Sequence, residues 1–273
     1  MSAEQTTPRA WRQGWWIAGN GVLLATLVGL AGLPAAANDT IDAAAAAYKR
    51  VAAGDIDQAV DGAERLATLL DRGDVVGARR AWIEARVGWE RSETFTATLF
   101  AAFDATIDPW PGGRTGFHAI EAQLFADPPG RPVEAAVALA EQLRLFRAAL
   151  AKADFTGAAL IGGVAALAYE VGESKSQGGE SRPSGTSLAD MRHNVEGLGR
   201  AWRGVFAPAL AARDARLAER IERDLAGLER QVAVASLAGL DQPLLEKTAE
   251  RLAGSIADAA VALGYPAPDF AAE

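Results

Sequence analysis

The stretch Gly116-Phe117-His118-Ala119-Ile120-Glu121 decides how this 273-residue chain is interpreted, in fold and in chemistry. Residues three positions apart lie on one face of an α-helix, so the imidazole and the carboxylate of this stretch can bind one metal ion together. Upstream, Trp89-Glu90-Arg91-Ser92-Glu93 repeats the spacing with two carboxylates. Both motifs need helices, and together they predict a helical metal-binding protein.

The composition also favours helices. Half of the residues are hydrophobic and 7% are aromatic, while alanine, leucine, arginine and glutamate are abundant. Residues of these types have high helix propensity, whereas the β-branched and aromatic residues that favour strands are sparse. A chain of this length can bury a sizeable core in one large or two small domains. We therefore predict an all-α protein built from antiparallel helical bundles.

Charge and cysteine content exclude several classes of partner and site. The formal net charge of −8 argues against nucleic acid, which attracts basic surfaces, and suits a cation, although acidity also serves solubility. The chain has no cysteine, so disulfides and thiolate sites for copper(I) or structural zinc are excluded. Lipid attachment also needs a cysteine, so we do not expect a lipoprotein.

The first 37 residues have the pattern of a secretory signal peptide. Arg9 and Arg12 precede an almost uncharged apolar stretch at 15–33, and Pro34-Ala35-Ala36-Ala37 ends in small residues typical of a cleavage site. The alternative is an uncleaved membrane anchor, because the apolar stretch is close to spanning length. We expect a periplasmic protein whose folded domain covers residues 38–273.

Periodicity and capping residues predict the helices. We expect them at residues 41–70, 74–95, a short segment to 103 or 104, 116–125, 133–151, 156–171, 187–205, 209–234 and 242–263. Asp39 or Thr40 is the expected N-cap of the first helix and Asp241 that of the last. Proline and glycine predict a loop at 108–113, and a polar Gly/Ser-rich loop at 172–185 could order around a ligand. A domain boundary is expected near residue 130 or in that second loop.

Longer motifs enclose the two short ones. The first runs from Ala85 to Glu93, and Asp104 and Asp108 stand between it and the Gly116 stretch. Further motifs are Glu170-Val171, Gly178-Gly179-Glu180 and the stretch 187–197. In this combination the chain resembles the imelysin-like family, in particular its periplasmic iron-uptake components of EfeO/EfeM type, from about residue 39 onward. One carboxylate of the family's Gly-Glu-Glu pattern is a glycine here.

The resemblance implies a fold, a cargo and partners. The fold would be two four-helix bundles with a metal site between or within them. The cargo would be iron, as Fe²⁺ or Fe³⁺, and the partners a membrane iron permease and a periplasmic haem peroxidase. The family has also been classed with metallopeptidases, so an enzymatic role stays open.

Six side chains are the candidate metal ligands. Spacing selects Glu90, Glu93, His118 and Glu121, and the resemblance adds Asp108 and Glu180. Bulky apolar neighbours indicate a partly buried face, where a carboxylate must be paired or bound to a metal. The alternatives are ordinary ones: a helix-surface pair for the imidazole and its carboxylate, a turn or cap for the aspartates, and a solvated loop residue for the last glutamate.

The types of donor atom limit which metal ions and which functions are expected. Mixed imidazole and carboxylate ligands suit iron, with Zn²⁺, Cu²⁺ or Ca²⁺ as alternatives. The paired Glu-x-x-His motifs of di-iron bundles are missing, which favours a mononuclear binding site. Iron capture and delivery is the expected function. Two alternatives remain: a metallopeptidase with Glu121 as general base, and a protein that binds an acidic polysaccharide through a divalent ion.

Overall fold

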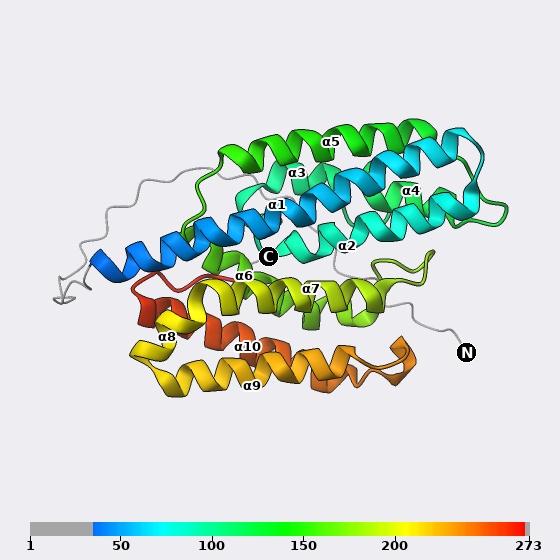
Figure 1. Cartoon of the computed structure of the whole chain (residues 1–273). Helices are drawn as coiled ribbons and strands as arrows, with labels where there is room; N and C mark the ends of the chain where they lie inside the picture. Colours follow the sequence, from blue (N-terminus) through cyan, green and yellow to red (C-terminus); the bar gives the residue numbers. More distant parts are fainter. Residues whose placement is uncertain (1–34, 271–273) are drawn as a thin grey trace, which may run out of the picture.

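The computed structural model describes residues 35–270, and within that range it consists of helices and their connections (Figure 1). The all-α prediction is confirmed. The predicted signal peptide lies outside the described residues except for its last three positions. Among helices that the structure describes, none combines the length and the apolar character that a membrane crossing requires.

The N-terminal half forms one bundle. Helices α1 (Ala35–Asp71), α2 (Val75–Leu99) and α5 (Val133–Lys152) are long, while α3 (Ala101–Ile107) and α4 (Gly116–Leu124) are short. The two short helices follow one another and both pack between α2 and α5, so together they act as a broken fourth helix (Figure 1). The loop that separates them contains prolines and glycines, which cannot continue a helix.

The C-terminal half forms a second antiparallel bundle of α6 (Gly157–Glu173), α7 (Ser187–Ala201), α9 (Ala215–Val232) and α10 (Gln242–Leu263), drawn in the lower half of Figure 1. A π-helical turn at Trp202–Phe206 and the short α8 (Ala207–Arg213) connect α7 to α9. Short 3₁₀ turns at Lys175–Gln177 and Leu237–Gly239 lie in the two loops at the other end. The bundles meet along α2, which packs against both α6 and α7.

Aromatic side chains from α2, α4 and α5 fill the core of the first bundle. Trp82, Trp89, Phe117 and Phe146 are all fully buried. The ring centroids of Trp89 and Phe146 lie 5.8 Å apart in an edge-on arrangement, and those of Trp89 and Phe117 lie 6.2 Å apart. Contacts of this kind add to the large apolar area that each ring buries. The short α4 is therefore held firmly against α2.

Two of the sequence-based boundaries were wrong. Helix α1 begins at Ala35, so neither Asp39 nor Thr40 is its N-cap. The single helix expected at 209–234 is two helices, because the chain turns at Asp214. The carboxylate of Asp214 accepts a hydrogen bond from the Leu217 amide at 2.9 Å and thereby starts a new helix. The predicted cap of α10 is confirmed, since Asp241 accepts from the Leu244 amide.

Candidate metal centre

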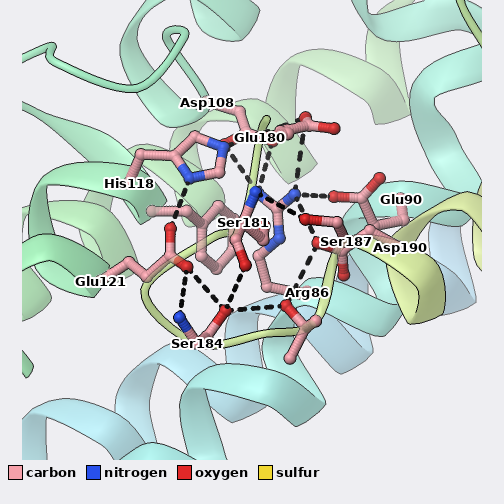
Figure 2. Close-up of polar contacts among 12 residues, drawn as sticks. Arg86, Glu90, Asp108, His118, Glu121, Glu180, Ser181, Ser184, Ser187 and Asp190 are labelled. Atoms are coloured by element: carbon pink, nitrogen blue, oxygen red, sulfur yellow. Dashed lines mark hydrogen bonds and ion pairs between the residues drawn. The ribbon is translucent and has the colours of Figure 1, made fainter. Parts of the chain in front are cut away.

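The six predicted ligands come together where the two bundles meet, and Figure 2 labels all of them except Glu93. The first bundle contributes α2, the end of α3 and α4, and the second contributes the α6–α7 loop and α7. The polar side chains gathered there are Arg86, Glu90, Glu93, Asp108, His118, Glu121, Lys175, Glu180, Asp190 and Asn194.

Two glycines allow the backbone approaches that build the site. Gly116 has φ +73°, and a Cβ there would lie 2.1 Å from the carbonyl oxygen of Ile107. Only glycine fits at this position, where the backbone folds back and brings the first turn of α4 beside the end of α3. A Cβ at Gly197 would lie 2.2 Å from the carbonyl oxygen of Arg91, so α7 approaches α2 closely. The site therefore depends on contacts that a larger residue would prevent.

His118 faces two carboxylates from different elements. Its Nε2 lies 3.3 Å from Oδ1 of Asp108 and 3.9 Å from Oε1 of Glu180. The residue is 3% exposed, and Nε2 has no hydrogen bond of good geometry. The three side chains offer donor atoms within 4.8 Å of one another, a spacing suited to one metal ion. A buried polar atom without a partner is costly, and a cation at this position would satisfy it.

Glu121 lies behind the imidazole. Its Oε2 is 2.8 Å from Nδ1 of His118, and its Oε1 accepts hydrogen bonds from the amide and the hydroxyl of Ser184 at 2.9 and 2.6 Å. Burial opposes the charged form, but these hydrogen bonds outweigh it and lower the pKa of Glu121. Both oxygens are thus engaged, and Glu121 is outside the three-residue group. Its role as a direct ligand stays a prediction.

A second group of donors adjoins the first. Glu90, Glu93, Asp108 and Glu180 also bring one oxygen each within 4.8 Å of one another. The Nζ atom of Lys175 lies among them, 2.9 Å from Oε2 of Glu93, 3.0 Å from each oxygen of Glu180 and 3.7 Å from Oε2 of Glu90. This group therefore already contains a cation of the protein's own.

Arg86 is the other cation of the cluster. Its Nη1 donates to both oxygens of Asp108 at 2.7 Å, and its Nη2 pairs with Glu90 and, at 3.4 Å, with Asp190. The guanidinium is 1% exposed and stacks over the rings of Trp82 and Phe117. Figure 2 shows it reaching the carboxylates from below the histidine.

Burial and mutual repulsion perturb the protonation of the cluster. Burial raises the pKa of Glu90 to about 8, although Arg86 and Lys175 oppose the shift. Burial and the Asp108 charge raise the pKa of Asp104 to about 6. Burial alone would favour a neutral imidazole, but Asp108 and Glu121 raise the pKa of His118 to about 9. The cluster thus has an excess of negative charge that its own cations do not fully balance.

Three members of the cluster were not among the site residues predicted from the sequence: Lys175, Asp190 and Asn194. The amide of Asn194 donates to Oε2 of Glu90 at 2.7 Å and to Oε2 of Glu93 at 2.8 Å. Asp190 and Asn194 are four residues apart, so they share one face of α7, and that spacing could have paired them. Nothing in the sequence distinguishes Lys175 from a solvated lysine in a polar loop.

Comparison with known proteins identifies the family. The model of the Imelysin family matches residues 44–115 and 112–264. The chain belongs to the imelysin family. Both matched segments together cover every residue of the cluster.

Several relatives have names that refer to iron uptake. The chain is 26% identical over 198 residues to iron uptake system component EfeM of Pseudomonas syringae, with 68% of each chain covered. It is 30% identical over 171 residues to iron uptake system component EfeO of Escherichia coli, covering 58% of this chain but only 44% of EfeO. An EfeM/EfeO family lipoprotein of Staphylococcus haemolyticus is 29% identical over 65% of each chain.

A solved structure shares the fold. A putative iron-regulated protein A precursor from Parabacteroides distasonis superimposes with a TM-score of 0.65 at 14% identity, covering 83% of this chain and 95% of that one. At this identity the likeness concerns the fold alone.

Proposed function

We propose that this protein captures iron at Asp108, His118 and Glu180 and hands it to a membrane permease as a component of an iron-uptake system. The observation that carries the proposal is the buried Nε2 of His118, which lacks a hydrogen-bond partner and faces two carboxylates from separate elements. Imidazole and carboxylate donors together suit iron in either oxidation state.

The atoms around the imidazole support binding through Nε2. A histidine that binds a metal through one nitrogen usually donates the N–H of the other to a carboxylate or carbonyl. Here Nδ1 can donate to Glu121, whose orientation is fixed by Ser184. Arg86 and Lys175 would balance part of the carboxylate charge while the ion is bound or released.

The names of the relatives support iron as the cargo. EfeM and EfeO are components of iron uptake systems, and the matched region of this chain contains the whole cluster. From this likeness we infer export to the periplasm by residues 1–37, delivery to a membrane iron permease, and a haem peroxidase as a further partner. These steps belong to the proposal.

The decisive experiment is a metal titration of stripped protein. Fe²⁺ under anaerobic conditions, Fe³⁺, Zn²⁺, Cu²⁺ and Ca²⁺ are titrated into wild-type protein and into His118→Ala. One tight iron ion per wild-type chain, lost in His118→Ala, supports the proposal. His193→Ala is the matched control, because the other histidine lies outside the cluster, with its Nδ1 3.4 Å from Oε2 of Glu196. Equal iron affinity in His118→Ala and wild type overturns the site.

The same protein preparation separates the alternative functions. Turnover of a peptide that stops with a chelator would indicate a metallopeptidase. Calcium-dependent binding of an acidic polysaccharide, without preference for iron, would indicate the polysaccharide-binding class. Tight iron binding without turnover supports capture.

A further inference from the structure

We propose that Lys175 takes the place of a second metal ion and thereby limits the centre to one. The inference rests on the proposed function, because it assumes that the first ion binds beside His118. It concerns a lysine that neither the spacing of the motifs nor the resemblance selected.

The position of the ammonium group is that of a bound cation. It lies within 3.0 Å of Glu93 and of both oxygens of Glu180, and 3.7 Å from Glu90. Lysine is rarely buried unless it is paired, and this one is 5% exposed. Three carboxylates from α2 and from the loop after α6 thus surround one ammonium, as they would surround an ion.

The two donor groups overlap. The group that includes His118 and the group that includes Glu90 and Glu93 share Asp108 and Glu180. Carboxylates shared in this way are the bridging ligands of dinuclear centres, in which two ions lie about 3.5–4 Å apart. The residues present could therefore hold two ions side by side, except that Lys175 lies in the second position.

Electrostatics explains why the lysine and a second ion exclude one another. An ion among Glu90, Glu93 and Glu180 would lie next to the ammonium in a poorly solvated interior, where like charges repel strongly. Without the ammonium, Glu93 would lose its cation at 2.9 Å, and Glu90 would keep only Arg86. Buried carboxylates in that state must take up protons or bind another cation.

The consequence is a centre that holds one ion at a time. Reactions that need a bridged pair of ions would require the second position, which Lys175 occupies. One ion bound at a time suits capture and release. Lys175 is accordingly a residue that determines stoichiometry.

The test counts ions in lysine variants. Wild-type protein, Lys175→Gln, Lys175→Met and Lys175→Arg are stripped and dialysed against Mn²⁺, and bound metal is measured per chain. The exposed Lys247→Met on α10 is the control. We expect one ion in wild type, Lys175→Arg and Lys247→Met, and two in Lys175→Gln and Lys175→Met. Electron paramagnetic resonance should show an isolated Mn²⁺ spectrum in the first set and an exchange-coupled pair in the second, which a merely structural role would not produce.

Each outcome decides the inference. One ion with an uncoupled spectrum in Lys175→Gln and Lys175→Met overturns it while leaving the proposed function in place. Wild-type protein that binds neither Mn²⁺ here nor iron in the titration overturns the proposed function and the inference with it. If it binds iron but no Mn²⁺, the ions in the same variants are counted with Fe²⁺ under anaerobic conditions. Neutral variants that lose helical circular dichroism should regain it when Mn²⁺ is added, because the ion replaces the ammonium. If they stay unfolded with the metal, the ion cannot take the place of Lys175 and the inference falls.

Discussion

The Nδ1 atom of His118 lies 2.8 Å from Oε2 of Glu121, one helical turn further along α4. The three-residue spacing of the motif was expected to place both side chains on one metal ion. In the structure it joins the imidazole and the carboxylate to each other. The imidazole is left with only Nε2 to face Asp108 and Glu180. The motif therefore orients one donor atom, and the other donors come from the chain segments around it.

Glu121→Gln should weaken metal binding without abolishing it. The amide can accept the N–H of Nδ1 or the two hydrogen bonds of Ser184, but its NH₂ group cannot accept either, so the imidazole loses its fixed orientation. We expect the affinity for iron to fall about 10- to 100-fold, as it does when such supporting carboxylates are changed. Glu141→Gln, an exposed change on α5, should leave the affinity as it is. Loss of binding as complete as in His118→Ala would instead make Glu121 a ligand.

Gly116→Ala should destabilise the protein and displace the histidine. The left-handed φ costs a residue with Cβ about 1–2 kcal/mol, and here the added Cβ would also collide with the carbonyl of Ile107. We expect a loss of more than about 2 kcal/mol in the free energy of unfolding, together with weaker iron binding. Gly112→Ala is the control, since its φ is +104° and nothing lies within 4 Å of an added Cβ. Urea unfolding and metal titration of both variants test this, and equal losses of affinity would contradict it.

Asn194→Asp should destabilise the metal-free protein. The change replaces a donor to Glu90 and Glu93 by a third carboxylate in a buried position. Breaking a buried network of this kind costs about 3–5 kcal/mol. Gln231→Glu makes the same chemical change beside Thr248, away from the cluster, and should cost less. Thermal unfolding of metal-free protein distinguishes them, and a similar loss in both variants would mean that Asn194 does not support the cluster.

How far the sequence predicts this structure depends on the range of each interaction. Helices such as α5 and α10 follow from local patterns of apolar residues and caps, and their positions were predicted closely. The break at Asp214 was not, because a single aspartate in a run of good helix formers gives a weak local signal. Only its hydrogen bond to the Leu217 amide shows that a new helix starts there.

In the candidate metal centre, too, local contacts could be predicted from the sequence and non-local contacts could not. His118 and Glu121 are paired by helix geometry, which the sequence displays directly. Lys175 and Glu93 are 82 positions apart in the chain and come into contact only because the two bundles pack together. Contacts of this range are set by the topology of the fold. The local sequence around Lys175, a Gly/Ser-rich loop, does not indicate that the lysine is buried. The chemistry of single motifs is therefore readable from sequence, whereas the balance of charge around them is not.

The alkaline stability of the protein should depend on Tyr48. Its hydroxyl on α1 is hydrogen-bonded to Oγ1 of Thr94 on α2 at 3.0 Å, and burial raises its pKa to about 12. In the unfolded chain a tyrosine ionises near its ordinary pKa of about 10. Because the folded-state pKa is the higher one, the stabilising contribution is complete below pH 10 and is lost as the pH rises towards 12.

Tyr48→Phe removes both the hydrogen bond and this titration. At pH 7 we expect its free energy of unfolding to be about 1 kcal/mol below that of wild type, the usual cost of a buried hydrogen bond. Above pH 10 the difference should shrink, because only wild type loses stability through Tyr48. Thr94→Val also loses the hydrogen bond but keeps the buried phenol, so its stability should still fall over the same range. Urea unfolding from pH 7 to pH 11 measures all three, and a constant gap between wild type and Tyr48→Phe would show that the phenol does not titrate with a raised pKa.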